Sequence, residues 1–257
     1  MVIFEENKSF SSIFPNTGST PNLQSFADGC ALATNYWSLT HLSLSNYMAA
    51  TSGVAYNFLP WSADCSPSGC STANENVFDL VGPNGWKSYQ ESMTANCSLS
   101  SNGLYVARHN PAAYYTDIDG GTLGGGACAA NDVPLGDTTS GALISDIGAG
   151  TLPLFSEVSP NLLDDMHDGT VAEGDAWLGT WIPLITAGAD YQSGRLTIAI
   201  VWDEGSGTGD TPSNVPAVFM SAYILPHTVS SAYFTHYTLY QTALDIAGVS
   251  LRRTLGF

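Results

Sequence analysis

Blocks of apolar and polar positions alternate along this chain and predict a succession of strands and helices. The run Leu196–Trp202 is nearly continuous in apolar residues and rich in β-branched ones, as in a parallel strand buried on both faces. Further apolar runs predict strands at 2–4, 31–37, 86–89, 152–158 and 215–220. Helical spacing with matching start and stop residues predicts helices at 21–28, 43–51, 74–80, 171–185 and 238–247.

This alternation predicts an α/β fold with a mostly parallel central sheet flanked by helices on both faces. The chain shows neither an internal repeat nor a domain linker, so we expect a single domain over residues 1–257. The segment 52–72 is expected to be a loop because Gly, Pro and Ser interrupt it. The segment 110–140, rich in Gly, Asp and Thr, predicts a long surface excursion.

Composition excludes some classes of function. The 23 Asp and Glu residues against six Lys and Arg give a net charge of −17, which argues against binding to nucleic acid or to an anionic membrane surface. Only 11% of residues are charged, which is typical of a secreted, acid-tolerant protein. No apolar stretch approaches the length of about 18 residues that a transmembrane segment needs. Because the chain opens directly on a strand pattern, we expect a signal sequence to be removed or to lie outside it.

Five cysteines bear on the compartment, and none form a Cys-x-x-Cys pair. The sequence therefore argues against a zinc knuckle or a thioredoxin-type motif. Their positions in loop-rich segments predict two disulfides, Cys70–Cys97 and Cys65–Cys128, with Cys30 left over. Five reduced cysteines are the alternative.

Acidic residues follow two of the predicted strands, as Glu5-Glu6-Asn7 and as Asp203-Glu204-Gly205. Ligands of open α/β sheets bind beyond the carboxyl ends of strands, so we expect both groups at one sheet edge. Oxygen-rich sets of this kind suit Mg²⁺, Ca²⁺ or Mn²⁺, with zinc also possible. The alternative is two pairs of solvated loop acids.

Two further segments carry candidate chemistry. The segment 161–169 crowds acidic residues around His167, which suits an acid or a phosphate contact. It is equally compatible with the loop before a helix, where Asp is favoured. The segment 40–47 places hydroxyls at a helix start, where they act as a nucleophile near free amides or simply as N-caps.

These segments together resemble a known family. Glu5 to Phe10 (Glu-Glu-Asn-Lys-Ser-Phe) is similar to the Glu-Asn-x-Ser-Phe/Tyr opening of the phosphoesterase family. That family groups bacterial acid phosphatases with phospholipases C inside the alkaline phosphatase superfamily. The remaining family motifs find their counterparts in order, at Ser43–Tyr47, Trp86–Met93, Arg108–Pro111, Asp165–Gly169 with Gly174–Leu178, Asp203–Gly205 and Thr235–Tyr237. The chain looks closest to the secreted, single-domain acid-phosphatase branch.

The resemblance implies one metal site that joins an acid after the first strand, the nucleophile and an acid pair after a late strand. Its ligands here are Glu6, Asn7, Asp203 and Glu204. They imply one divalent ion (Mg²⁺, Ca²⁺, Mn²⁺ or Zn²⁺). The nucleophile position falls on Ser43.

The resemblance also implies substrate contacts around that metal. His109 and His167 take the place of a second cation near the phosphate, and either one is a candidate proton donor. Further substrate-binding side chains are expected from Arg108, Asn46, Asp165, Asp168 and His236. Asn161, Asp165 and His236 have the spacing of a second superfamily metal site, but these ligand types are poor for zinc, so we expect a single metal.

One departure from the family pattern affects the nucleophile. The proline of the family motif is Ser45 here, which leaves the register between Thr40 and Ser43 open. The family nucleophile lies two residues before its Pro-Asn pair, and Ser45-Asn46 occupies that pair, so we favour Ser43.

The sequence thus predicts a secreted, metal-dependent acid phosphatase that hydrolyses small phosphate monoesters through a phosphoserine. We expect it to bind a small phosphorylated substrate and not nucleic acid, and we expect no transmembrane segment. A phospholipase C-type phosphodiesterase is one alternative. A non-catalytic binding protein on the same fold is the other.

Overall fold

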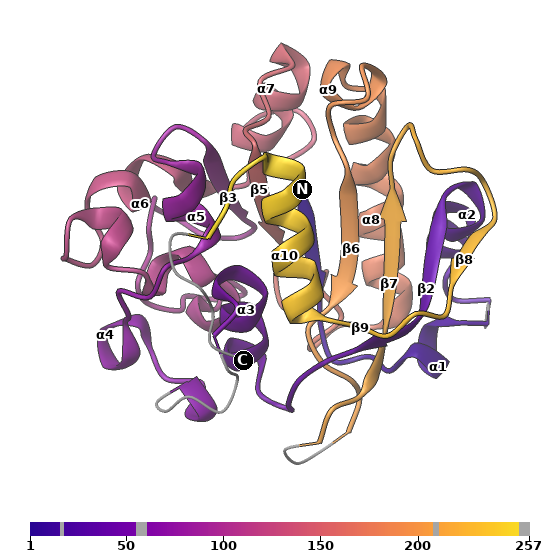
Figure 1. The fold of residues 1–257 in the computed structure, drawn as a ribbon, viewed down its shortest axis with the longest axis horizontal. Coiled ribbons are helices and arrows are strands. Elements are labelled where there is room, and N and C mark those ends of the chain that lie inside the picture. Colours follow the sequence, from indigo (N-terminus) through magenta and orange to yellow (C-terminus); the bar gives the residue numbers. More distant parts are fainter. Residues whose placement is uncertain (16–17, 55–60, 208–210, 252–257) are drawn as a thin grey trace.

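A sheet runs through the centre of the molecule in the computed structural model, which describes residues 1–15, 18–54, 61–207 and 211–251 (Figure 1). Its order is β4-β3-β5-β1-β6-β7-β2-β8, and β9 also pairs with β2. Only β7 is antiparallel to its neighbours among these described strands, so the predicted, mostly parallel α/β fold is confirmed. The strands are β1 Val2–Glu5, β2 Ala31–Trp37, β3 Trp86–Gln90, β4 Asp132–Pro134, β5 Phe155–Ser159, β6 Ile198–Trp202, β7 Asn214–Met220, β8 Thr228–Ser230 and β9 Phe234–Thr235.

Helices cover the sheet on both sides. One layer is made by α10, which lies in front of the sheet in Figure 1 and packs against α3 and α5; the other includes α8 with α2 and α9. In the described part of the chain, no helix has the length and apolarity needed to span a bilayer. The helices are α1 Phe10–Ile13, α2 Pro21–Gly29, α3 Ser43–Ser52, α4 Pro67–Cys70, α5 Val77–Val81, α6 Gly126–Asn131, α7 Ala142–Ala149, α8 Val171–Ala187, α9 Ala189–Gln192 and α10 His236–Ala247; short 3-10 turns are η1 Trp61–Ala63, η2 Ala107–His109, η3 Pro111–Tyr114 and η4 Asp117–Asp119.

The two central strands bring the acidic segments together. All five residues of β6 are buried, as its continuous apolar pattern predicts. Strand β1 lies between β5 and β6 and pairs with β6 in parallel, with Glu5 opposite Trp202. The ladder continues one step further, because the Asp203 amide donates to the Glu5 carbonyl at 3.0 Å. Glu6 and Asp203 therefore leave the sheet side by side at its carboxyl edge.

Helix α3 begins at Ser43, as predicted, and each of its ten residues is buried. It ends at Ser52, and the next residue, Gly53, has a φ of 66°, the left-handed conformation that favours glycine at a helix C-terminus. Helix α8 begins behind a capping box in which Thr170 and Glu173 bond each other's backbone amides. It extends to Ala187, two residues beyond the predicted end.

The expectation that 110–140 forms a surface excursion is right only in part: residues 120–126 and 136–140 lie at the surface, but the rest of the segment contributes buried structure. Pro111–Tyr114 forms a buried turn, and Asp132–Pro134 is the edge strand β4, parallel to β3. Tyr114 and Tyr115 can be buried because their hydroxyls find partners, the Cys65 carbonyl at 2.7 Å and the Thr51 hydroxyl at 2.8 Å.

Two disulfides are present and Cys30 is free, as predicted, but the predicted pairing is wrong. The bonds are Cys65–Cys70 and Cys97–Cys128. Cys65 lies just before the short helix α4 and Cys70 is its last residue, and their Cα atoms are 6.1 Å apart. The Cys97 amide donates to the carbonyl of Asp132 just after α6, which holds Cys97 beside Cys128. In both cases, a short helix or a backbone hydrogen bond already holds the two cysteines close together, and the disulfide links them there.

Candidate active site

The candidate site lies where β1 and β6 end and α3 begins. Glu6 is fully buried, and its Oε2 accepts a hydrogen bond from the Ser43 hydroxyl at 3.2 Å. Its Oε1 accepts from the Tyr47 hydroxyl at 2.8 Å. Ser43 and Tyr47 lie four residues apart, on the same face of α3, so one helix turn presents both hydroxyls to one carboxylate.

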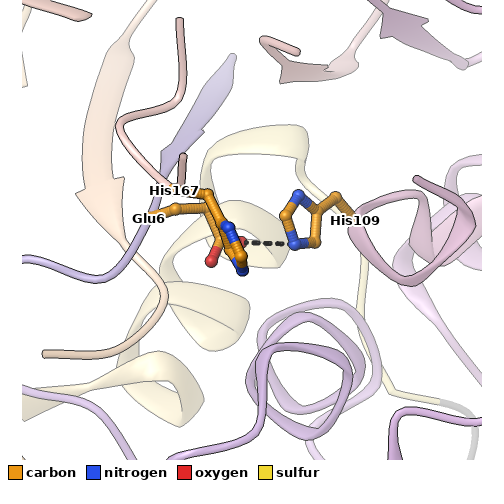
Figure 2. A group of neighbouring side chains, drawn as sticks. All are labelled: Glu6, His109 and His167. Atoms are coloured by element: carbon orange, nitrogen blue, oxygen red, sulfur yellow. Dashed lines mark ion pairs between the residues drawn. The ribbon is translucent and has the colours of Figure 1, made fainter. Parts of the chain in front are cut away.

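His109 closes this group from η2 (Figure 2). Its Nε2 lies 3.2 Å from Glu6 Oε1, and its Nδ1 lies 3.1 Å from Asp165 Oδ2. The imidazole stacks on the Tyr47 ring at 5.5 Å between centroids, with 5° between the planes. Ligand-type atoms of Glu6, His109 and His167 all lie within 4.8 Å of one another. Two imidazoles thus face the carboxylate that holds Ser43.

His167 occupies the more open side of the group. Its side chain is 25% exposed, whereas that of His109 is 3% exposed. Arg108 Nη2 lies 3.1 Å from His167 Nε2, and Asp168 Oδ1 lies 2.7 Å from His167 Nδ1. Because a guanidinium can only donate, Nε2 accepts and the ring proton faces Asp168. Arg108 and His167 are therefore the groups placed to meet an anion arriving from solvent.

The second acidic pair lies across from Glu6. Asp203 Oδ1 accepts from the backbone amides of Asn7 at 3.3 Å and Glu204 at 2.6 Å, while Oδ2 is buried without a hydrogen-bond partner. Asn7 has a φ of 57°, a conformation that asparagine tolerates better than most residues. Glu204 contacts His41 Nδ1 at 3.3 Å and Asn46 Nδ2 at 3.4 Å.

Four carboxyl groups share this small volume. Burial, followed by the charge of Asp203, raises the pKa of Glu6 well above its usual value. Burial likewise raises the pKa of Asp203 to about 7, that of Asp165 to about 8 and that of Glu204 to about 10. Burial and then the charge of Arg108 lower the pKa of His109 well below its usual value. Among the described residues, no lysine or arginine forms an ion pair with any of the four acids.

Oxygen donors of this kind suit a hard divalent cation, but among the described residues of this site the ligand atoms that all lie within 4.8 Å of one another are those of Glu6, His109 and His167, not those of Glu6, Asp203 and Glu204. Clustered buried carboxylates are stable only when protonated or when they share a cation, and Asp203 Oδ2 has no hydrogen-bond partner. Glu6, Asn7, Asp203 and Glu204, the ligands that the sequence predicts, lie at one sheet edge as expected. The structure does not assemble Asn161 and His236 with Asp165 into a second such set. Asn161 bonds Asp164 and Leu163 in its own loop, and His236 contacts the Asp203 carbonyl at 2.6 Å and the Tyr36 hydroxyl at 3.0 Å.

The geometry separates Ser43 from Thr40. The Ser43 hydroxyl donates to Glu6 at 3.2 Å. The Thr40 carbonyl instead accepts from Asn46 Nδ2 at 3.1 Å, so Thr40 belongs to the turn that Asn46 fastens before α3.

Three side chains near the site were missed by the sequence predictions: Tyr47, His41 and Asp64. Tyr47 had a usable signal, because it follows Ser43 by one helical turn. Asp64 Oδ1 accepts from the Leu44 amide at 3.0 Å, and this contact between a loop and the start of α3 leaves no local pattern. His41 meets Glu204 only because β6 ends opposite the same loop.

A polar cleft of about 270 Å³ adjoins the site, and Asp64 and Arg108 lie on its wall. Asp64 links the cleft to the residue after Ser43, and Arg108 links it to His167. Its other lining side chains include Ser66, Ser68, Ser100 and Ser101.

Comparison with known proteins matches a model of the Phosphoesterase family to residues 15–250. The chain belongs to the Phosphoesterase family. As a member, this phosphoesterase is a hydrolase that acts on phosphate esters.

Curated relatives of this phosphoesterase include bacterial and fungal proteins. It is 28% identical over 254 residues to a phosphatidylinositol-3-phosphatase of Mycobacterium tuberculosis, covering 97% of this chain and 76% of that one. It is 24% identical over 241 residues to an acid phosphatase of Aspergillus fumigatus, covering 88% of this chain and 50% of the relative. With a phosphate-repressible acid phosphatase of Penicillium chrysogenum, the identity is 25% over 228 residues, with 85% and 52% covered. The chain thus spans about half the length of the two fungal relatives.

Solved structures share the fold of this phosphoesterase at low identity. A protein of the alkaline phosphatase superfamily from Vibrio parahaemolyticus has a TM-score of 0.62 at 14% identity, covering 96% of this chain and 66% of that one. The C-terminal periplasmic domain of EcEptC from Escherichia coli, solved in complex with Zn, has a TM-score of 0.53 at 10% identity, with 97% and 82% covered. The fold is therefore that of the alkaline phosphatase superfamily.

Proposed function

We propose that this phosphoesterase is a metal-dependent acid phosphatase that hydrolyses phosphate monoesters through a phosphoserine at Ser43. The observation that carries the proposal is the Ser43 hydroxyl bonded to buried Glu6, at a helix start and beside three more buried carboxyl groups. The curated acid phosphatases and the phosphatidylinositol-3-phosphatase among its relatives support phosphate release as the reaction. The two disulfides also support an extracellular location.

A divalent ion held by Glu6, Asn7, Asp203 and Glu204 would supply positive charge to the phosphate oxygens and favour the ionised form of Ser43. Glu6 orients the Ser43 hydroxyl at the start of α3, where the positive end of the helix dipole favours the negative charge of the phosphoryl oxygens. Arg108 holds the phosphate from the solvent side, with Asp168 fixing the His167 ring.

In the first step the Ser43 hydroxyl loses its proton to solvent, the Ser43 Oγ–P bond forms and the bond from phosphorus to the leaving oxygen breaks. When Arg108 turns from His167 to the phosphate, Nε2 of His167, the more exposed imidazole, is free to carry the proton that the leaving oxygen takes. His109 contacts both Glu6 and Asp165 from the buried side and so fixes the positions of their carboxyl groups. In the second step water attacks the phosphoserine, phosphate leaves and Ser43 regains its proton.

The cleft beside the site favours small, polar monoesters over phospholipids. A phospholipase C would need an apolar mouth for acyl chains. The cleft is lined mainly by polar groups, four serines with Asp64 and Arg108, and its apolar share is limited to Leu99, Ala107, Tyr114 and the disulfide-bonded Cys65. Hydroxyl and charged groups suit a hydroxylated leaving group.

The decisive experiment compares Ser43→Ala with Thr40→Ala on an aryl phosphate. We expect Ser43→Ala to lose at least about 10⁴-fold in kcat and Thr40→Ala to keep substantial activity. A chelator is expected to abolish wild-type turnover, and Mg²⁺, Ca²⁺, Mn²⁺ or Zn²⁺ to restore it. If Ser43→Ala is active and Thr40→Ala is inactive, the nucleophile is Thr40 and not Ser43. A wild-type protein without turnover, but with phosphate or sugar binding, would favour the binding-protein alternative.

A further inference from the structure

A second buried acid lies inside the sheet, away from the proposed metal ligands. Glu157 is at the centre of β5, fully buried, and paired with Ser88 of β3 on one side and Val2 of β1 on the other. Its Oε2 accepts from the Ser88 hydroxyl at 2.6 Å and from Gln90 Nε2 at 2.7 Å. Its Oε1 lies 2.6 Å from the Ser159 hydroxyl at the end of the same strand.

The Ser159 hydroxyl joins this acid to the active site. It lies 2.7 Å from the carbonyl oxygen of His109, the residue whose imidazole contacts Glu6 and Asp165. A serine hydroxyl has one proton, and a carbonyl oxygen can only accept. If Ser159 donates to the His109 carbonyl, the 2.6 Å contact with Glu157 is a hydrogen bond only when Glu157 carries a proton. An ionised Glu157 would leave two oxygen acceptors in bare contact, which is costly in the interior.

The surroundings of Glu157 favour the protonated form. Burial raises its pKa to about 8, although hydrogen bonds from Ser159 and Ser88 oppose the shift. Asp132 on β4 adds repulsion, and the nearby phenol of Tyr105 is a further titratable group that interacts with Glu157.

We propose that Glu157 is a positioning residue: its protonated carboxyl donates to Ser159, which holds the His109 carbonyl and so fixes the imidazole against Glu6. The proposal rests on the proposed function only where it predicts an effect on turnover. The proton on Glu157 follows from hydrogen-bond geometry alone. When Glu157 loses that proton, Ser159 turns its own proton to the Glu157 carboxylate and no longer donates to the His109 carbonyl. The imidazole of His109 is then held less firmly, so kcat should fall under alkaline conditions.

Three variants on one strand test this chain of contacts. Glu157→Gln keeps a donor toward Ser159 and an acceptor toward Ser88 and Gln90, so kcat should stay within about twofold of wild type under acid conditions. Ser159→Ala breaks the link and should lower kcat about 10-fold while KM changes little, because misplacing a catalytic group costs turnover. Ser156→Ala is the matched control, since Ser156 is a buried serine of β5 whose hydroxyl has no hydrogen-bond partner. It should retain wild-type kcat.

The pH profile and infrared spectroscopy complete the test. Above about pH 7, kcat of the wild type should fall faster than kcat of Glu157→Gln, whose amide does not titrate. The carboxylic-acid carbonyl band of Glu157 should be present in the wild type near pH 6 and absent from Glu157→Gln. Absence of that band in the wild type, or equal kcat for Ser159→Ala and Ser156→Ala, overturns the proposal. A wild type without phosphatase activity would refute the proposed function, while the infrared band would still decide the protonation of Glu157.

Discussion

Tyr47 donates to Glu6 and stacks on His109, so it holds both sides of the proposed catalytic group. We expect Tyr47→Phe to keep the stacking and lose the hydrogen bond, which leaves Glu6 free to turn from Ser43. Activity, as kcat/KM on an aryl phosphate, should fall about 10-fold, while the free energy of unfolding falls by about 1 kcal/mol. Tyr115→Phe is the control, because its buried hydroxyl bonds Thr51 away from the site. Equal activity in the two variants would show that the Glu6 contact is only structural.

Single residues differ in how far the sequence reveals them. Glu6, Asp203 and Glu204 could be placed because parallel strands end at one edge and their order along the chain matches family motifs. Asp64 and Glu157 could not, because their roles depend on contacts made across loops and between strands. The sequence around a glutamate in a strand does not show which hydroxyl groups of other strands will surround it in the folded protein.

The two disulfides fasten different elements and should contribute unequally to stability. Cys97–Cys128 closes a separation of 31 residues beside β4, whereas Cys65–Cys70 closes only five around α4. In the chain-entropy account, loops of these lengths correspond to about 4 and about 2 kcal/mol. We therefore expect replacement of Cys97 and Cys128 by serine to lower the melting temperature more than replacement of Cys65 and Cys70. Thermal unfolding monitored by circular dichroism checks this, and the reverse order would contradict it.

Strongly patterned elements could be predicted, and short or edge elements could not. Strand β6 and helix α8 follow from apolar runs and end signals that hold over several residues. Strand β4 has three residues and contains Asp132, so its sequence resembles a loop. The antiparallel direction of β7 also leaves no trace in its own residues, because an apolar strand reads alike in either direction.

Across the described part of the molecule, most buried acidic side chains form no ion pair with a lysine or arginine. The net charge is −17, and within the described residues only two ion pairs involve a lysine or arginine, Lys87–Asp146 and Arg195–Asp190. Burial raises the pKa of Glu157 to about 8, and those of Asp132 and Glu91 to about 7. None of these three acids is among the proposed metal ligands, so their protonation bears on stability whether or not metal is bound.

These shifts set the direction in which stability depends on pH. A carboxyl group whose pKa is higher in the folded than in the unfolded chain binds more protons when folded. The stability that it contributes is fully present below its unfolded pKa, about 4, and is lost as pH rises through the folded values of about 7 to 8. We therefore expect the melting temperature, measured with chelator present, to be at least about 5 °C higher near pH 5 than near pH 8. Glu157→Gln replaces one of these titrating carboxyl groups by a neutral amide. The melting temperature of this variant should therefore fall less than that of the wild type between pH 5 and pH 8. A melting temperature that rises from pH 5 to pH 8 in both proteins would show that the buried acids are ionised in the folded chain.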